Sequence, residues 1–505
     1  MGVVKRTLLR LLGGSILIVL LATAASATTF FEDVGIISDA IGHGVLIKPA
    51  FLAPTYAGQP VTILILGSDT RALSHIAVDR LDPRHSDTIL LAHLDPQSGQ
   101  TTLMSIPRDL QVSYYAHGGF YPNVKINSAI TYGGPTKTVQ VVEHLLGIKI
   151  NDLIVIDFQA FAFLTDGLGC VYIDVDHLYS NPGNNGYSQI YIPPGYRPLC
   201  QYQALSYVRY RHDDSTYARD AREQDYIREA KQQLGIRTSL LTNPSELQAL
   251  LTRVSSNGGI ETNIHGTNAV LRLVEIAEAS VAKPVRQLQF PNDGSVVSAS
   301  GANQVVPSQS QLQALTQDFL YGRNEVYLPP KSAAPAKGSH HHHHRHAGVS
   351  AAAALGLVPV PTYALDDARV MQVSVPFPVE MPRVTSPAGF FPAADAFYHF
   401  SYKVPWVATY GGLKYHAYRI TWQDGSELGA YYGIDGMDWT HPPLFENAKT
   451  DVIGGRTYMF VTNGGHWQDI GWIQGKDLYW VSNTLFDNIS NPAMLQIAES
   501  ATPVS

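Results

Sequence analysis

Short apolar runs alternate with helix-like patterns between residues 61 and 240. The runs are bounded by Gly, Pro and Asp, as buried strands usually are, and one segment with helical spacing ends at a glycine. The strand-like runs are VTILILG (61–67), DTILLAHLD (87–95), TTLMSIP (101–107), IVIDF (154–158) and VYIDV (171–175), and the helical segment is KTVQVVEHLLG (137–147). This alternation predicts an α/β domain, layered α-β-α around a central mixed sheet.

Three further helix-like segments and a β-like stretch (286–306) follow and complete this domain, which we predict over residues 55–328. The helix-like segments begin PSELQALL, NAVLRLVE and SQLQALTQ. Residues 329–361 then combine Pro, Ala, Gly and Ser with a histidine tract (His340 to His346), which predicts a linker. The tract would bind nickel or zinc in a test tube, but its setting fixes no geometry for a physiological metal site.

The sequence of residues 362–505 predicts a smaller C-terminal α+β domain that is rich in Trp. Its residues indicate no function for it. Short β-like runs such as KYHAYRITW, TYMFVTNG and KDLYWVSNTL are separated by Gly and Asp turns, and NPAMLQIAES predicts a short final helix. All six tryptophans of the chain lie here. They could stack on sugar rings or form the core of the domain, and the sequence leaves both interpretations open.

Composition narrows the class of protein. The chain has 505 residues, of which 45% are hydrophobic and 15% charged, so it is an ordinary globular protein of more than one domain. Its net charge of -7 offers no general attraction for nucleic acid, and no helix-turn-helix pattern is present. We therefore predict no nucleic-acid partner.

The N-terminus predicts export. Lys5, Arg6 and Arg10 surround the start of a long apolar run, which predicts a single-pass membrane anchor over residues 1–28 with the rest of the chain on the extracytoplasmic side. The small residues at 22–27 also resemble a signal-peptide cleavage site, so a released form is the alternative. In an exported chain, the two cysteines, Cys170 and Cys200, predict a structural disulfide.

Two aspartates follow or open neighbouring strands. Asp69 comes directly after the first strand in GSDTR, and Asp87 opens the next in HSDT, so both carboxylates are expected at one edge of the sheet. Carboxylates that leave room for a substrate phosphate suit Mg²⁺ (or Mn²⁺). Standing alone, each aspartate would more often be a turn or cap residue.

A set of basic residues favours a phosphate ligand. Arg108 follows a strand in SIPRD, and an extended ALSYVRYRH would place Arg209 and Arg211 on one face. Guanidinium forks match phosphate oxygens, and Lys125 and Gln224 add donors. From the residues alone, a pyrophosphate site and a solvated charged face remain equally open.

Several ordered motifs over about 170 residues closely resemble the LytR-CpsA-Psr family of bacterial cell-envelope phosphotransferases. The motifs are ILGSDTR, HSDTILLAHLDP, LMSIPRDLQV, KINSAITYGGP, IDFQAFAFLTDGLG, ALSYVRYRHDD and REQDYI. The resemblance implies transfer of a glycopolymer from a polyprenyl pyrophosphate carrier to peptidoglycan, with a phosphodiester link formed and with pyrophosphatase activity as a further capability. It also implies a membrane-held enzyme.

The resemblance assigns roles to residues of this chain. Asp69 and Asp87 bind magnesium, and Arg108 and Asp109 join them in the catalytic set, with Asp109 or Asp69 as the proton acceptor. The implied pyrophosphate contacts are Arg108, Lys125, Arg209, Arg211 and Gln224, supported by Arg219 and Arg222. Where the family commonly has Arg and Gln, this chain has His85, next to Arg84, and Glu223, so the pyrophosphate roles of Arg84 and His85 stay open.

Two alternatives belong to other classes of function. The chain could bind polyprenyl pyrophosphate lipids without turnover, or it could be an envelope regulator. The helix at 137–147 and the FQAFAFL segment (158–164) could line a lipid channel, although ordinary core packing explains them equally well.

Overall fold

The computed structural model describes residues 47–56, 58–68, 85–183, 189–211, 214–236, 260–264, 283–291, 295–297, 303–323, 347–387, 397–403, 414–425 and 428–504. The predicted anchor (1–28), the histidine tract and the two predicted helices between residues 244 and 281 lie outside the described residues. Among the described residues, no helix is both long enough and apolar enough to cross a membrane.

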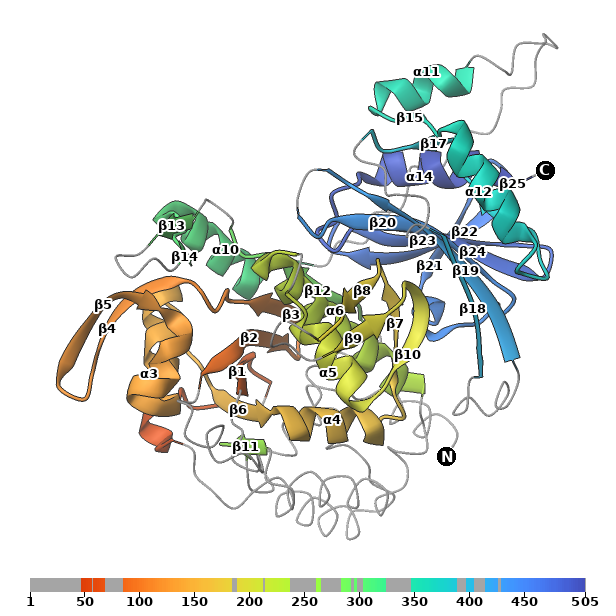
Figure 1. Cartoon of the computed structure of the whole chain (residues 1–505). Coiled ribbons are helices and arrows are strands. Elements are labelled where there is room, and N and C mark those ends of the chain that lie inside the picture. Colours follow the sequence, from red (N-terminus) through yellow and green to blue (C-terminus); the bar gives the residue numbers. More distant parts are fainter. Residues whose placement is uncertain are drawn as a thin grey trace. The chain divides into compact units, whose positions relative to one another are not determined.

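The chain divides into two compact units. The first comprises residues 1–171, 199–209 and 219–324, and the second comprises 172–198, 210–218 and 325–505. The second unit therefore includes two segments from the middle of the chain, which the local sequence pattern did not predict. Figure 1 shows the elements of both units in sequence colours.

A six-stranded mixed sheet forms the centre of the first unit, as predicted. Its strand order is β11-β6-β1-β2-β3-β12, with parallel pairs β1–β6 and β3–β12 and antiparallel pairs elsewhere. The strands are β1 (Val61–Ser68), β2 (Ser86–Asp95), β3 (Gln100–Ser105), β6 (Asp152–Asp157), β11 (Ile260–Thr262) and β12 (Val285–Leu288). The near-continuous burial of β1, β2 and β3 explains why their sequences read as unbroken apolar runs.

Helices and two hairpins accompany this sheet. They are α3 (Ala129–Leu146), α4 (Phe158–Gly167), α5 (Gln201–Arg209), α6 (Thr216–Ile236), α10 (Gln309–Tyr321), the 3₁₀ turns η2 (Pro49–Phe51) and η4 (Ile126–Ser128), and the hairpins β4 (Gln111–Ala116) with β5 (Gly119–Lys125) and β13 (Ser295–Val297) with β14 (Asn303–Val305). Helix α3 is interrupted at Gly134, before Pro135, and ends where Gly147 adopts the left-handed conformation. The predicted helix 137–147 is its continuous part.

Cys170 and Cys200 form a disulfide that joins the end of the α4 region to the start of α5. The cysteines are 30 positions apart, and the loop between them includes β7 (Val171–Val175), β8 (Tyr179–Asn181), β9 (Ile190–Ile192) and β10 (Gly195–Leu199). Most of this loop belongs to the second unit, so the disulfide closes the point where the chain leaves the first unit and returns to it.

The second unit is β-rich and is centred on a seven-stranded antiparallel sheet of order β18-β19-β20-β24-β23-β22-β21. Its strands are β18 (Phe397–Lys403), β19 (Lys414–Gln423), β20 (Tyr431–Met437), β21 (Lys449–Ile453), β22 (Arg456–Asn463), β23 (His466–Gln474) and β24 (Asp477–Ser482). The other elements are α11 (Ala347–Ala354), α12 (Thr362–Gln372), α14 (Asn491–Ser500), η5 (Pro443–Phe445) and the short strands β15 (Val358–Pro359), β16 (Glu380–Met381), β17 (Val384–Thr385) and β25 (Thr502–Pro503). Residues 347–361, predicted as linker, thus contain α11 and β15.

Each face of this sheet has its own core. On β19, Tyr418, Ile420 and Trp422 belong to the core that includes α12 and α14, whereas Tyr415 and Ala417 belong to a core with Tyr172 and Tyr196. The two sets alternate because successive side chains of a strand point to opposite faces. The segment 172–198 therefore covers the face of the sheet that the C-terminal helices leave uncovered.

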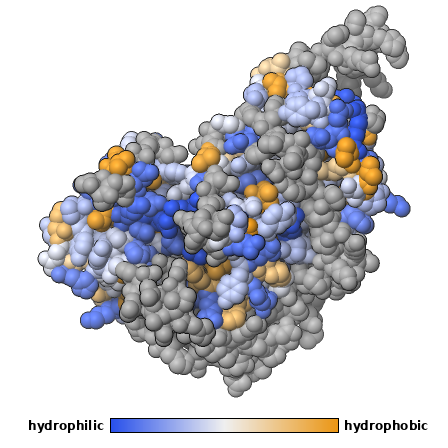
Figure 2. Space-filling model, in the orientation of Figure 1, coloured by the Kyte–Doolittle hydropathy of each residue, from blue (hydrophilic) through white to orange (hydrophobic). Residues whose placement is uncertain are grey.

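Five of the tryptophans of the second unit are core residues. Trp422, Trp439, Trp467, Trp472 and Trp480 are all buried, and Trp406 lies outside the described residues. Burial of the five rules out their use as exposed sugar-stacking platforms and explains the Trp content by packing. On the face shown in Figure 2, hydrophilic residues predominate and apolar residues lie singly or in small groups.

Candidate active site

Asp87, at the start of β2, lies between two arginines from other parts of the first unit. Arg108 donates from Nη1 to its Oδ1, and Nη2 of Arg209 lies 3.6 Å from its Oδ2. Burial alone would raise the pKa of this carboxyl, but Arg108, Arg209 and Arg219 together hold it below its usual value. Asp87 is therefore ionised at neutral pH.

A second acid and base pair extends the cluster. Lys125, at the end of β5, donates from Nζ to Oδ1 of Asp109 over 2.6 Å, and Nε of Arg108 lies 3.9 Å from the other Asp109 oxygen. Arg108 thus lies between two carboxylates. All four side chains are less than one-third exposed, which strengthens their interactions relative to a fully solvated surface.

Helix α6 adds a buried layer behind these residues. Arg219 donates to Asp220 over 2.6 Å, and its Nε lies 3.7 Å from Oε1 of Glu223. Thr88, the neighbour of Asp87, donates from Oγ1 to the same Glu223 oxygen over 2.7 Å. Burial raises the pKa of Glu223 to about 8, although Arg219 and Thr88 oppose the shift.

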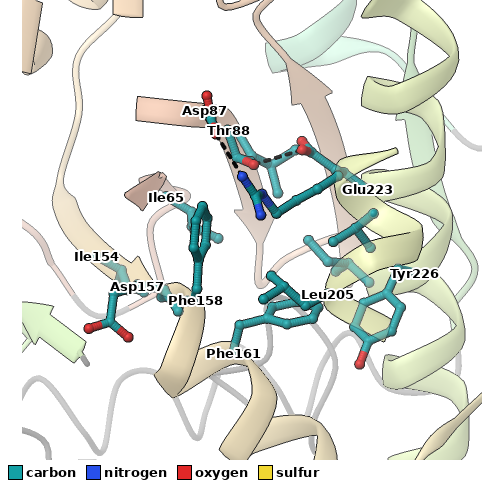
Figure 3. Close-up of a pocket in the computed structure, with 16 residues that line it drawn as sticks. Ile65, Asp87, Thr88, Ile154, Asp157, Phe158, Phe161, Leu205, Glu223 and Tyr226 are labelled. Carbon is teal, nitrogen blue, oxygen red and sulfur yellow. Dashed lines mark hydrogen bonds and ion pairs between the residues drawn. The ribbon is translucent and has the colours of Figure 1, made fainter. Parts of the chain in front are cut away.

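A pocket opens beside this cluster and combines charged and apolar walls (Figure 3). Asp87, Thr88 and Glu223 lie at one end, and Phe161, Leu205 and Tyr226 lie at the other. The remaining lining is Ile65, Gly67, Leu90, Ile154, Ile156, Asp157, Phe158, Val208, Arg209 and Ile227. Because Arg209 lines the pocket next to Asp87, the charged end can take an anionic group, and the apolar end suits a hydrocarbon.

The arginines of ALSYVRYRH do not lie on an extended strand, so that prediction was wrong. Gln201–Arg209 is helix α5, whose buried residues Ala204, Leu205, Tyr207 and Val208 recur at helical spacing. Arg209 ends the helix, and its guanidinium lies 3.8 Å from the centre of the Phe158 ring. Arg211 is exposed, in the segment 210–218 that belongs to the second unit.

The other predicted phosphate ligands differ in accessibility. Arg222 is fully buried and donates from Nε to the Tyr207 carbonyl over 3.2 Å, and buried Gln224 donates to the Leu288 carbonyl over 3.1 Å. Both hold α6 in place from behind the cluster. His85 is half-buried just before β2, whereas Asp69 and Arg84 lie outside the described residues.

The predicted metal site is only partly described. Among the described residues, no group of three or more His, Cys, Asp or Glu side chains is arranged to hold a metal ion. Asp87 has the ionised oxygen ligand that Mg²⁺ prefers, and it lies at the rim of a pocket where a substrate phosphate could complete the shell. Its chemistry therefore fits a hard divalent cation.

Sequence reasoning missed Thr88 and Asp220 and treated Glu223 only as a departure from a pattern. For Asp220 and Glu223 the signal was present in RDAREQD, where acids alternate with arginines at a spacing that lets a helix bury both, whereas Thr88 had no such signal. Phe158 and Phe161, named as candidates for a lipid channel, do line the pocket, whereas no residue of 137–147 does so.

Comparison with known proteins gives relatives for the first part of the chain. An uncharacterised Staphylococcus aureus protein is 31% identical over 170 residues, which cover 34% of this chain and 41% of that protein. The Bacillus subtilis polyisoprenyl-teichoic acid–peptidoglycan teichoic acid transferase TagV is 26% identical over 258 residues, covering 50% of this chain and 62% of TagV. The chain thus spans roughly half the length of these two relatives.

The chain is also similar to a Streptococcus agalactiae protein whose crystal structure is known. The two sequences are 23% identical, the match covers 52% of this chain and 86% of the other, and the TM-score is 0.45. The model of the LytR_cpsA_psr family matches residues 46–319, more than half of the chain. This range includes β1 to β3, the cluster around Asp87 and helix α6. The chain therefore belongs to the LytR_cpsA_psr family.

Proposed function

We propose that this protein is an extracytoplasmic phosphotransferase that moves a glycopolymer from a polyprenyl pyrophosphate carrier to peptidoglycan. The observation that carries the proposal is the pocket, with Asp87 and Arg209 among its charged residues and an apolar wall that includes Phe158 and Phe161. Such a pocket would hold the pyrophosphate and the first part of the lipid chain. TagV, to which the chain is similar, is named as a transferase of this kind.

The phosphate groups would be held by the basic side chains of the cluster. Three basic side chains pair with an aspartate in the cluster: Arg108, Lys125 and Arg209. Each has further N–H groups that would donate to phosphate oxygens. Arg219 would act from behind through the field of its buried charge. Arg222 and Gln224 would support the cluster through α6, and Arg211, Arg84 and His85 are further candidates.

In the proposed reaction, a sugar hydroxyl of the wall attacks the phosphorus nearer the glycan. A new oxygen–phosphorus bond forms, the bond to the bridging oxygen breaks, and polyprenyl phosphate leaves with its electron pair. Asp109 or Asp69 accepts the hydroxyl proton. Because negative charge moves onto the leaving phosphate, the arginines act chiefly by electrostatic stabilisation.

Asp87, together with Asp69, would hold Mg²⁺ (or Mn²⁺). When bound, the cation neutralises charge on the phosphate oxygens during transfer. If water replaced the sugar hydroxyl, the same site would act as a pyrophosphatase. The protein would work at the outer face of the membrane, held by its N-terminal segment, with the tryptophan-rich α+β second unit as an accessory domain.

The test uses the full chain in detergent, with a polyprenyl pyrophosphate-linked glycan, peptidoglycan and Mg²⁺. We expect release of polyprenyl monophosphate and a glycan that becomes bound to the wall. Arg108→Ala should lower the rate about 100-fold, because it removes a charge that meets the transferred group. The control is Arg369→Ala, which removes an exposed arginine paired with Asp366 and should leave the rate unchanged.

Two results would favour other functions. If the wild type binds the lipid but releases no more monophosphate than Arg108→Ala, the protein is a binder of polyprenyl pyrophosphates. If it neither binds nor turns over the lipid, a regulatory role in the envelope becomes the better explanation.

A further inference from the structure

Glu223 of helix α6 brings an unpartnered hydrogen-bonding atom to the wall of the pocket. Its side chain is almost completely buried and lines the same end of the pocket as Asp87 and Thr88 (Figure 3). The carboxyl oxygen Oε2 is buried and has no hydrogen-bond partner among the described residues. A buried polar atom without a partner is costly, so each one in a folded protein requires an explanation. In the wall of a pocket, a ligand is the natural partner.

The other oxygen of the same carboxyl already accepts a hydrogen bond. Thr88 donates from Oγ1 to Oε1 over 2.7 Å, and Nε of Arg219 lies 3.7 Å from the same oxygen. Both neighbours are donors, so a proton on this carboxyl belongs to Oε2 and makes that oxygen a donor. The two oxygens therefore have different roles: Oε1 holds the side chain in place, and Oε2 can meet a ligand.

Close packing on β1 holds Thr88 in this arrangement. Gly67 of β1 is the register partner of Thr88, and a Cβ atom added to Gly67 would lie 2.8 Å from Thr88 Cβ and 2.9 Å from its Oγ1. The glycine thus leaves just enough room for the threonine side chain. Because Thr88 is packed against β1, its hydroxyl stays directed at Glu223, and the carboxyl loses little freedom when a ligand binds.

The surroundings of Glu223 favour its neutral form. Burial is the largest effect and raises the pKa of Glu223 to about 8. Arg219 opposes this shift, whereas Asp220 on the same helix and Asp87 on β2 add to it. The other charged or titratable residues that line the pocket are Asp157 of β6, Arg209 of α5 and Tyr226 of α6. At neutral pH the charged end of the pocket therefore has one carboxylate, Asp87, which is paired with Arg209.

A neutral carboxyl in this position suits an anionic oxygen as its ligand. The Oε2 hydroxyl would donate to that oxygen, and hydrogen bonds to charged acceptors are among the strong ones. Arg209 offers positive charge at the same end of the pocket. Phosphate oxygens meet both requirements, since they accept hydrogen bonds and carry charge. An ionised Glu223 would instead add a second carboxylate to the end that has Asp87, and it would repel a phosphate.

We propose that Glu223 binds the phosphate part of the substrate as an un-ionised carboxylic acid, with Oε2 donating a hydrogen bond to a phosphate oxygen. This inference rests on the proposed function, because that function brings a pyrophosphate to the pocket. It adds a regulatory property to the site: affinity for the substrate is full when Glu223 is protonated and falls when Glu223 ionises.

The test uses the full chain in detergent, at constant Mg²⁺, titrated with farnesyl pyrophosphate at pH 7 and at pH 9. The variant is Glu223→Gln, because a glutamine can accept from Thr88 with its oxygen and donate to the ligand with its nitrogen at both pH values. We expect equal affinities at pH 7. At pH 9 the wild type should bind about tenfold more weakly than Glu223→Gln, because only about a tenth of its molecules keep the proton.

Glu223→Leu removes both hydrogen-bonding atoms. It should bind about tenfold more weakly than the wild type at pH 7 and should show the same pH trend as Glu223→Gln. The matched control is Glu380→Gln, since Glu380 is a buried glutamate of the second unit whose pKa burial raises to about 7, and it does not line the pocket. This control should bind as the wild type does at both pH values.

Inorganic pyrophosphate is the second probe. It should show the same dependence on Glu223 and pH with a lower affinity, because it lacks the apolar part that would contact the other end of the pocket. Equal affinities for the two probes would assign the site to free phosphate and contradict a lipid-linked ligand.

The inference is wrong if the wild type and Glu223→Gln respond to pH alike, or if neither protein binds either probe. It is also wrong if Glu223→Gln unfolds at the same temperature as the wild type but binds weakly at pH 7, because the ligand would then require a carboxylate. Monophosphate release by the wild type is measured separately. No release would contradict the proposed function alone, whereas release without the difference at pH 9 would contradict this inference alone.

Discussion

Thr88 donates a hydrogen bond of 2.7 Å to Glu223, which joins the first strand position after Asp87 to the buried side of helix α6. Arg219 lies on the same helix, 3.7 Å from the same Glu223 oxygen. The strand that carries the candidate catalytic aspartate is thus tied to a helix through a carboxyl that is almost completely buried. A change in the protonation of Glu223 would therefore act directly on its contacts with Thr88 and Arg219.

The first prediction concerns Glu223→Gln and pH. Because burial raises the folded-state pKa of Glu223 to about 8, its contribution to stability is fully present below about pH 4.5 and is lost as the pH rises through 8. Glutamine keeps the acceptor for Thr88 but does not ionise. We expect the variant to gain stability relative to the wild type between pH 5 and pH 8, by roughly 3 kcal/mol.

Thermal unfolding of both proteins at the two pH values measures this difference. Glu446→Gln, at an exposed position of the second unit, is the control and should show no such trend. A stability difference between Glu223→Gln and the wild type that is the same at pH 5 and pH 8 would refute the prediction.

The second prediction concerns the contact of Arg209 with Phe158. The guanidinium lies 3.8 Å from the ring centre and also reaches Asp87, so its plane is fixed from two sides. Arg209→Lys keeps the charge but loses the planar fork and the stacking. We expect binding of polyprenyl pyrophosphate to weaken about tenfold, measured by titration in detergent.

Arg369→Lys is the control for this titration, since the Arg369 side chain is 49% exposed and pairs with Asp366 in the second unit. Equal affinities of Arg209→Lys and the wild type would show that Arg209 contributes charge alone, or nothing, to lipid binding.

The third prediction concerns a buried ion cluster in the second unit. Arg419 donates from Nη1 to Asp174 over 2.9 Å and to Asp435 over 2.6 Å, and its side chain is 1% exposed. Burial raises the pKa of both aspartates, although Arg419 opposes the shift. Arg419→Met would leave two buried carboxyls without their cation and should destabilise the protein by about 3 to 5 kcal/mol.

Urea unfolding followed by tryptophan fluorescence measures this loss, because the five described tryptophans of the second unit are buried. Arg369→Met serves as an exposed control and should change stability by less than about 1 kcal/mol. An unchanged midpoint for Arg419→Met would mean that the cluster is stabilised in another way.

The local pattern of the chain predicted its strands well but not their distant partners. The runs at β1, β2 and β7 are strongly apolar, and burial on both faces leaves that mark in the sequence. The packing of Tyr172 and Tyr196 on the C-terminal sheet leaves no mark in the local sequence, because their partners are more than 200 residues away. Helix α5 was misread since both alternation and helical spacing fit so short a segment.

The candidate site was partly predictable for a similar reason. Asp87, Arg108, Lys125 and Arg209 were chosen for their chemistry, and the structure brings all four into one cluster. The acids that balance these charges from α6 were not predicted as site residues. Their role depends on how deeply the helix is buried, and charged residues in a helix more often indicate a solvated face.

The last prediction follows from the composition of the second unit. A chain that ends at residue 328 keeps every residue matched by the family model but loses the sheet that covers the segment 172–198. Tyr172 and Tyr196, both fully buried against residues such as Trp439, would become exposed, and Asp174 would lose Arg419. We expect the shortened chain to aggregate or to unfold at least 10 °C below the full chain, about the effect of losing a few kcal/mol.

Differential scanning fluorimetry and size-exclusion chromatography of the two chains provide the measurement. A shortened chain with Tyr172→Thr and Tyr196→Thr is the informative comparison, because polar residues suit the exposed face and should recover part of the solubility. If the unmodified shortened chain is monomeric and as stable as the full protein, the segment 172–198 does not depend on the C-terminal sheet. In that case the contacts of Tyr172, Tyr196 and Arg419 would contribute little to folding. The loss of unfolding free energy in Arg419→Met would then have to be small as well.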